Sequence, residues 1–325
     1  MTDPFDSVSS PVLGPPPVRL DDERRTVATV SAVVVTFWTG SILKECLSAL
    51  VAEPEIAEII IVNNGNDRNT EAWLEAFRET DSRVGLVYPG GNLGFAAGCN
   101  YGAARATGAF IALVNPDLVL PAGAIARFLE VFRDQPDAWL CGGRLEHPDG
   151  TEQRGGRREE LTPWRGFVEL TRLDRLFSGH PTFRRLHRYQ QPAVRQVCEV
   201  PTVSGAFMMI PRDLYESLGG MDEAMFMHFE DADICRRVRQ GGGRVLYCGH
   251  IPLTHHLSTS DVSRVFVEWH KARSMIYYIR KHFAGSTPFP VILAVRVVLW
   301  LRWTILVPSL LFRDGPGIMR RIRRH

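Results

Sequence analysis

The fold is decided by two apolar runs, Val30-Ser31-Ala32-Val33-Val34-Val35 and Ile59-Ile60-Ile61-Val62. Each run is continuous rather than alternating, which is typical of a strand that is covered on both faces in a parallel sheet. Leu43, Leu47 and Leu50 lie between the runs at helical spacing. Because strand, helix and strand alternate, we predict a doubly wound α/β sheet with its ligand crevice at the carboxyl ends of the strands.

The alternation continues downstream. We expect a helix around Trp73, Leu74 and Phe77, a strand over residues 84–87, a helix over residues 96–107 and a strand over residues 110–114. The first strand is followed by Thr36-Phe37-Trp38-Thr39-Gly40, which lacks the glycines of a dinucleotide-binding turn. A dehydrogenase is therefore disfavoured, and no P-loop pattern occurs either.

Composition narrows the remaining classes. The 325 residues include 38 basic and 36 acidic side chains, so no overall field favours nucleic acid, and we expect none as a partner. Six cysteines form no C-x-x-C pair, which favours reduced thiols and a cytoplasmic location. Residues 1–26 are rich in Pro, Ser and Asp, and we expect a disordered tail. Residues 27–260 would form the main domain, and residues 261–325 a helical region.

One candidate site is Asn115-Pro116-Asp117, which directly follows the predicted strand over residues 110–114. A carboxylate at this edge can hold a divalent cation, which in turn can neutralise a leaving diphosphate. The alternative is an Asx or proline turn that only ends the strand.

A second candidate is the acidic cluster Glu230-Asp231-Ala232-Asp233, which opens a predicted helix. Acidic residues are favoured in a first helical turn by the helix dipole, and that role alone would explain one of them. Three carboxylates within four positions exceed this need. One that faces a pocket can take the proton from an attacking hydroxyl.

Two weaker candidates accompany these. Adjacent side chains of an extended chain point in different directions, so at most one of His255 and His256 is expected to reach a given metal, and ordinary packing is the alternative. Residues 92–100, which read NLGFAAGCN, carry small side chains into a helix and would allow a ligand close to backbone N–H groups.

Taken in order, these elements resemble glycosyltransferase family 2, the inverting enzymes with the GT-A fold, and specifically its rhamnosyltransferase-like branch. The resemblance covers residues 30–283. The matching stretches include residues 92–100, Asn115-Pro116-Asp117, Gly143-Arg144-Leu145, Pro148-Asp149-Gly150, Val203-Ser204-Gly205-Ala206-Phe207, Gly219-Gly220-Met221-Asp222-Glu223, Glu230-Asp231-Ala232-Asp233, the two histidines and Tyr277-Tyr278-Ile279-Arg280-Lys281. The resemblance implies a nucleotide-diphospho-sugar transferase with a doubly wound mixed sheet and a C-terminal helical extension.

The resemblance also implies roles for single residues. Asp117 would coordinate Mg²⁺ or Mn²⁺ with His255 or His256, His255 being preferred. Asp231 would be the catalytic base, while Glu230 and Asp233 would orient the acceptor or the helix. The donor would be bordered by Thr36, Asn63, Asn92, Gly94, Asn100 and Asn115.

Two positions depart from the usual family pattern. Asn63 stands where an acidic residue commonly accepts a hydrogen bond from a pyrimidine ring, so the choice between uridine and thymidine donors stays open. Asn115 replaces the first acid of the D-x-D motif, which is normal for this branch and leaves Asp117 as its main carboxylate.

The implied reaction transfers a sugar, with L-rhamnose from dTDP-rhamnose as the expected donor, to a polyprenyl-linked or polysaccharide acceptor in cell-envelope glycan synthesis. A family 2 enzyme with a UDP-hexose donor, a nucleotidyltransferase and a non-catalytic carbohydrate-binding relative are the alternatives. A nucleotidyltransferase would need a glycine-rich loop after the first strand, and that loop is missing.

Two further regions suggest how an acceptor is reached. Residues 150–200 interleave ten arginines with aromatic residues. This is expected either of a segment that binds a diphosphate-linked lipid acceptor or lies on an anionic membrane, or of a solvated surface. Residues 289–312 are largely apolar but contain Arg296 and Arg302. They favour a helix lying on the inner face of the cytoplasmic membrane over one that spans it, and packing on the domain or on a second subunit is the alternative.

Overall fold

The structure is a computed structural model that describes residues 29–314, apart from Ser178, Gly179, Arg185, Gln190, Ser258, Asp261 and Pro288. The expected tail over residues 1–26 and the arginines beyond residue 314 lie outside the described residues.

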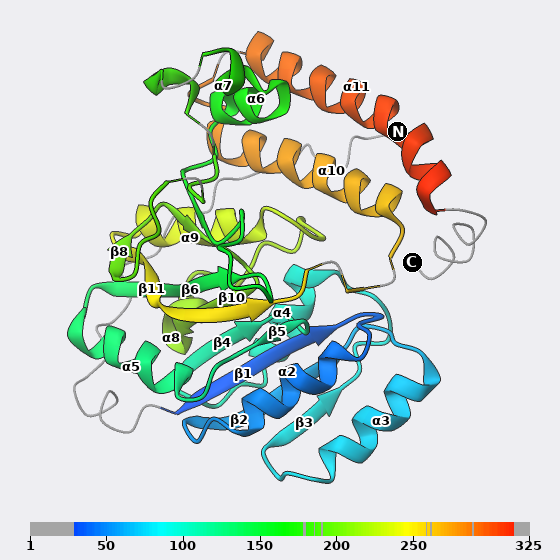
Figure 1. The fold of residues 1–325 in the computed structure, drawn as a ribbon, viewed down its shortest axis with the longest axis vertical. Helices are drawn as coiled ribbons and strands as arrows, with labels where there is room; N and C mark the ends of the chain where they lie inside the picture. The colour runs from blue at the N-terminus through cyan, green and yellow to red at the C-terminus, as the bar shows by residue number, and fades with distance from the viewer. Residues whose placement is uncertain are drawn as a thin grey trace.

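Nine strands of the described chain form one mixed sheet (Figure 1), in the order β3-β2-β1-β4-β10-β6-β11-β5 with β8 beside β11. Their bounds are β1 Val30–Thr36, β2 Ile56–Asn63, β3 Val84–Val87, β4 Phe110–Val114, β5 Leu118–Val119, β6 Ala138–Glu146, β8 Val197–Glu199, β10 Phe207–Pro211 and β11 Arg244–His255. The first four strands are parallel, and β10 then runs antiparallel to both β4 and β6. β1 is buried along its whole length, as its unbroken apolar run predicts.

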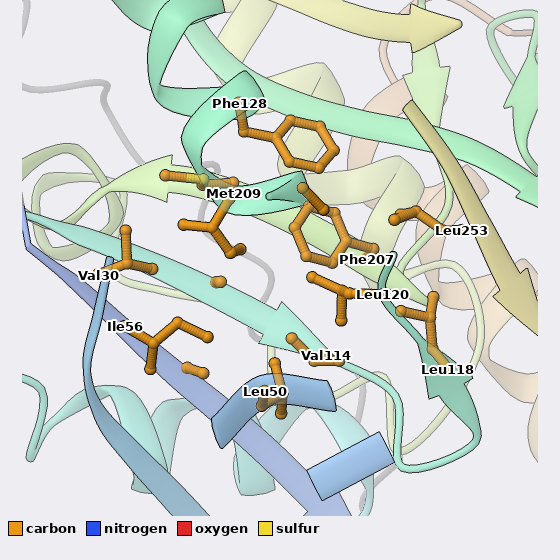
Figure 2. Close-up of a cluster of buried hydrophobic side chains, with 14 of the residues drawn as sticks. Val30, Leu50, Ile56, Val114, Leu118, Leu120, Phe128, Phe207, Met209 and Leu253 are labelled. Atoms are coloured by element: carbon orange, nitrogen blue, oxygen red, sulfur yellow. The ribbon is translucent and has the colours of Figure 1, made fainter. Parts of the chain in front are cut away.

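Helices cover both faces of this sheet, so two apolar cores result. The bounds are α2 Ile42–Val51, α3 Arg68–Arg78, α4 Phe95–Ala103, α5 Ala124–Asp134, α8 Arg212–Ser217 and α9 Glu230–Gln240. α2, α3 and α5 enclose one core, in which Leu50 and Phe128 pack against Val114 and Phe207 of the sheet (Figure 2). The opposite core lies under α4, α8 and α9. The predicted doubly wound α/β sheet is confirmed.

A third layer lies over α9 (Figure 1) and consists of α6 Pro163–Thr171, α7 Leu173–Leu176, α10 Arg264–Phe283 and α11 Phe289–Asp314. Its core joins Ala232 of α9 to Met275 and Tyr278 of α10 and to Leu299 of α11. The expected C-terminal helical extension is therefore present. Between residues 29 and 314, none of the described helices combines the length and apolarity needed to cross a bilayer.

Besides α6, α7 and β8, the arginine-rich segment over residues 150–200 contains the short strand β7 Arg157–Arg158 and a 3₁₀ turn Pro181–Phe183, and β7 pairs with β9 Thr202–Val203. Many of its arginines are paired with acidic side chains. The pairs are Arg154–Glu169, Arg157–Glu152, Arg158–Asp231, Arg165–Glu159 and Arg188–Glu159. Several of these charges therefore hold the segment to itself and to the domain.

Candidate active site

The first part of the site forms where β4 ends and the chain turns through Asn115-Pro116-Asp117. The short strand β5 follows at once and pairs antiparallel with the end of β11, so that Leu118 lies opposite His255. Neighbouring strands lie about 5 Å apart, and this register places the imidazole of His255 beside the carboxylate of Asp117. Both side chains are buried. His256 uses its backbone N–H to donate to the carbonyl oxygen of Asp117, at 3.0 Å.

Gln153 determines which nitrogen of His255 faces the carboxylate. The Gln153 amide nitrogen donates to the carbonyl oxygen of His255 at 2.5 Å, which directs the amide oxygen to His255 Nδ1 at 2.9 Å. Nδ1 must then carry a hydrogen, because an amide oxygen only accepts. His255 Nε2 lies 3.1 Å from Asp117 Oδ1. When it carries a hydrogen, Nε2 donates to the carboxylate, and when it does not, it presents a lone pair that a cation can bind.

Without that hydrogen, Asp117 Oδ1 and His255 Nε2 are two acceptor atoms at a distance that suits a shared cation. Octahedral Mg²⁺ has metal–oxygen distances of about 2.0–2.1 Å, so two adjacent ligands lie about 3 Å apart. A ligating histidine also commonly donates its other N–H to a polar group, and Gln153 supplies that group here. Among the described residues, no three His, Cys, Asp or Glu side chains form a metal cluster on their own. A cation would thus need further ligands from a substrate or from water.

Asp117 is held as a carboxylate. Burial raises its pKa, but hydrogen bonding to His255 and the 3.1 Å hydrogen bond donated by the Thr259 hydroxyl outweigh this, and the pKa lies below its ordinary value. Asn115, the other polar side chain of the turn, lies 3.4 Å from His255 Nε2 through its amide nitrogen.

The second part of the site forms at the first turn of α9. Two consecutive residues before it, His228 (φ 63°) and Phe229 (φ 71°), adopt the left-handed conformation that residues other than glycine rarely adopt. This turn presents the carboxylates of Glu230 and Asp231 at the helix start, where the helix dipole favours negative charge.

The carboxylate of Asp231 accepts three hydrogen bonds. Oδ2 accepts from the Arg158 guanidinium and, at 3.0 Å, from the Gly205 N–H, and Oδ1 accepts from the Ala232 N–H at 2.7 Å. Burial alone would raise the pKa of Asp231, but Arg158 and these donors hold it below the usual range. Asp231 is therefore ionised at neutral pH.

The surroundings of Glu230 shift its pKa in the opposite direction. Burial, followed by the charge of Asp231, raises its pKa to about 8. Its Oε2 has no hydrogen-bond partner within the part of the chain that the structure describes. Two adjacent carboxyl groups thus have pKa values pushed apart, which is a pattern typical of acid–base sites.

Asp233 lies on the same helix but serves packing. Its carboxylate is fully buried and binds Arg237 and, on α10, Lys281 and His282, each at 2.7 Å. Lys281 also binds Asp222 at 2.7 Å. These contacts join α9 to α10, and a role of Asp233 in orienting the acceptor or the helix stays a prediction.

The expected donor-binding residues lie mainly at the last positions of β1 and β2 and in the loop after β3. Asn63 accepts from the Gly65 N–H and from the Asn66 side chain, and Thr36 and Asn66 lie within hydrogen-bond distance. Asn92 caps the Gly94 N–H at 3.0 Å. Gly94 has φ 85°, and a Cβ atom there would lie 2.4 Å from the carbonyl oxygen of Phe226, so only glycine fits.

Asn100, in the second turn of α4, has different partners. Its amide binds the backbone of Met221 and the Tyr215 hydroxyl, and it lines a cavity of about 290 Å³ beside Gly220. These contacts fasten the loop over residues 219–223. A role beside the donor stays a prediction for this residue.

Backbone contacts connect the two parts of the site. The Asn115 N–H donates to the carbonyl oxygen of Ala206, and the neighbouring Gly205 N–H donates to Asp231. Gln153 and Arg158, which sequence reasoning missed, add a second connection, because one short segment carries the partner of His255 and the partner of Asp231. The only signal for Arg158 was its membership of an arginine-rich stretch. Asn64, which bonds Asn92 and the Gly94 carbonyl, was also missed.

Comparison with known proteins identifies the family. Residues 31–219 match the family model described as glycosyl transferase family 2. The chain belongs to this family. The expectation of a family 2 transferase is thereby confirmed, and a nucleotidyltransferase is disfavoured.

Curated relatives include rhamnosyltransferases. The chain is 25% identical over 299 residues to the N-acetylglucosaminyl-diphospho-decaprenol L-rhamnosyltransferase of Mycobacterium tuberculosis, covering 87% of this chain and 94% of that protein. It is 30% identical over 89 residues to rhamnosyltransferase WbbL of Escherichia coli, covering 26% and 33%. It is also 27% identical over 207 residues to the uncharacterized protein y4gI of Sinorhizobium fredii, covering 62% of this chain but about a fifth (21%) of that protein. The family and the rhamnosyltransferase-like resemblance are thus supported by relatives of different lengths.

Solved structures confirm the fold. GalNAc-T7 has a TM-score of 0.57 at 14% identity, covering 83% of this chain and 54% of that one. The mannosyltransferase PcManGT of Pyrobaculum calidifontis has a TM-score of 0.53 at 15% identity, covering 87% and 73%. The GT-A fold expected from the resemblance is therefore confirmed.

Proposed function

We propose that this protein is a metal-dependent inverting glycosyltransferase that moves L-rhamnose from dTDP-rhamnose to a lipid-linked or polysaccharide acceptor in cell-envelope glycan synthesis. The observation that carries the proposal is the pairing of Asp117 with His255 at the carboxyl edge of the sheet, with an ionised Asp231 connected to it through Gly205 and Ala206. The name of the Mycobacterium tuberculosis relative, which aligns over most of both chains, supports the sugar and the lipid-linked acceptor.

Asp117 Oδ1 and His255 Nε2 would hold Mg²⁺ or Mn²⁺. Two solved structures of this fold contain Mn²⁺ with UDP or with GDP-mannose, which supports such a cation here. When bound, the ion neutralises charge that develops on a leaving diphosphate. Gln153 keeps the His255 ring in the orientation and tautomer that ligation requires.

Asp231 would act as the base. Its carboxylate removes the proton from the acceptor hydroxyl as the oxygen forms a bond to the anomeric carbon, and the bond from that carbon to the diphosphate breaks on the opposite face. The configuration of the sugar is inverted, and the nucleoside diphosphate leaves with the electron pair of the broken bond. Thr36, Asn63, Asn92, Gly94 and Asn115 would border the donor.

The C-terminal region would hold the protein at the inner face of the cytoplasmic membrane. Residues 261–325 contain 12 Lys or Arg and 3 Asp or Glu, whereas residues 1–260 contain 26 and 33. Exposed apolar side chains follow one face of α11 at four-residue spacing, namely Leu293, Val297, Leu301 and Ile305. A basic segment with an exposed apolar stripe suits an anionic bilayer surface. Flotation with anionic vesicles tests this, and a Leu301→Glu variant that binds as well as the wild type would contradict it.

A donor screen tests the function. Binding and transfer are measured with dTDP-rhamnose, UDP-glucose, UDP-galactose and GDP-mannose, each with Mg²⁺ or Mn²⁺ and with EDTA. We expect metal-dependent binding of dTDP-rhamnose and its transfer to a polyprenyl-diphosphate sugar. Preference for a UDP-hexose would replace the donor assignment, and failure to bind any donor in the presence of metal would overturn the enzymatic proposal.

A further inference from the structure

Two adjacent arginines of β7 have contrasting surroundings. Arg157 is held by Glu152 through Nε and Nη2, and Nη2 also donates to the carbonyl oxygens of Gln191 and Pro192. These contacts all lie within the segment over residues 150–200. Because side chains alternate along a strand, Arg158 points the other way. It reaches Asp231, and it donates to the Val203 carbonyl oxygen at 2.9 Å.

The contact with Arg158 leaves one acceptor position of the Asp231 carboxylate open. Each carboxylate oxygen accepts about two hydrogen bonds. Oδ2 accepts from Arg158 and the Gly205 N–H, whereas among the described residues Oδ1 accepts only from the Ala232 N–H. One lone pair of Oδ1 therefore stays available for an incoming hydroxyl.

Arg158 is also the positively charged side chain that compensates the carboxylate of Asp231. The ionisable groups around Asp231 are Glu230, Asp233 and Cys235 on α9, His228 before it and Arg158 on β7. His228 is uncharged at neutral pH, because burial lowers its pKa to about 4. Asp233 is engaged by Arg237 and α10. One guanidinium thus serves two adjacent carboxyl groups, and the structure pairs it with Asp231.

We propose that Arg158 is a positioning residue of the transfer reaction: it anchors Oδ2 of Asp231, keeps the negative charge on Asp231 rather than Glu230, and leaves Oδ1 to receive the acceptor proton. This role rests on the proposed function. Arg158 acts through Asp231. It follows that its loss should change kcat and the pH dependence of kcat more than donor binding.

The experiment compares Arg158→Gln, Arg158→Lys and the matched control Arg157→Gln in the full chain. Metal-dependent donor binding and the pH profile of kcat are measured for each. For Arg158→Gln we expect kcat to fall about 10²-fold, as for a misplaced catalytic group, with donor binding nearly unchanged. The acid limb of the profile should move to higher pH, since the pKa of Asp231 rises without the guanidinium. Arg158→Lys should give a smaller shift in the same direction.

Arg157→Gln should lower the melting temperature without moving the acid limb. An unmoved limb in folded Arg158→Gln, or an equal shift in Arg157→Gln, would overturn the role of Arg158. Should Arg158→Gln not fold, Arg158→Lys decides, and a wild-type profile with wild-type kcat would count against the role. Absence of transfer by the wild type would instead overturn the proposed function, and this role with it.

Discussion

The two ends of the candidate site differ in how a buried carboxylate is compensated. At the acidic helix, Asp231 has a cation of the chain itself, Arg158, together with two backbone N–H donors. At the strand end, Asp117 has an imidazole and a hydroxyl, neither of which carries a permanent positive charge. A buried charge is costly unless it is paired. The chain therefore completes one end by itself and leaves the other suited to an external cation.

This difference suits the two carboxylates to the separate tasks that we propose for them. The end that is already paired can keep its charge in the absence of any ligand, as a base must. The end that lacks a cation can bind one together with a diphosphate. Variants at the two ends should therefore impair different quantities, namely kcat at Asp231 and metal-dependent donor binding at Asp117.

The largest effect is expected for Asp231→Asn. An amide cannot take the acceptor proton, and general-base catalysis contributes about 10²–10⁴-fold to rate. We expect kcat to fall by that range while metal-dependent donor binding is retained. Turnover close to that of the wild type would remove Asp231 from the mechanism.

Asp117→Asn should weaken metal-dependent donor binding. The amide keeps the shape of the turn but removes the charge that faces His255 Nε2, so metal-dependent donor binding should weaken by about 10²-fold or more, as for loss of about 3 kcal/mol. Calorimetry with donor and Mn²⁺ checks this. Equal donor binding with and without metal in both the wild type and the variant would contradict the assignment.

Sequence reasoning identified the groups that lie at element boundaries. The runs before Thr36 and Asn63 have the apolar continuity of buried parallel strands, and the turn at Asp117 follows directly from the strand before it. His255 was preferred over His256 only through the resemblance, and the register of β5 with β11 places it beside Asp117. Such boundaries are visible in a sequence, because local composition changes there.

Gln153 and Arg158 could not be found in this way. Each acts through a contact with a residue far along the chain, 102 positions away for Gln153 with His255 and 73 for Arg158 with Asp231. Nothing in the local pattern separates Arg158 from Arg157, although one contacts the proposed base and the other Glu152. Long-range register, and not composition, determines these roles.

A smaller effect, on metal affinity, is expected for Gln153→Ala, which tests the strand end of the site. Loss of an outer partner of a metal-ligating histidine typically costs about 10–100-fold in metal affinity. We expect the Mn²⁺ concentration needed for half-maximal donor binding to rise by that range, with the pH profile of kcat unchanged. A shifted acid limb would show that Gln153 acts on Asp231 and not on His255.

The smallest effect on rate is expected for Glu230→Gln, which tests whether the second carboxyl of the acidic helix is neutral. Burial raises the pKa of Glu230 from 4.5 to about 8, so between these values the folded protein holds a proton that the unfolded chain has released. Stability is therefore lost as the pH rises through this window. Glutamine resembles the protonated side chain but cannot ionise, so this loss of stability should disappear in the variant.

Melting temperatures measured at pH 5.5 and pH 8 should differ less for Glu230→Gln than for the wild type, by roughly 2–4 °C for each kcal/mol recovered. The kcat of the variant should fall far less than that of Asp231→Asn. A variant that loses as much kcat as Asp231→Asn would mean that the base is shared by both carboxyl groups, and the contrast between a paired, charged Asp231 and a neutral Glu230 would not hold.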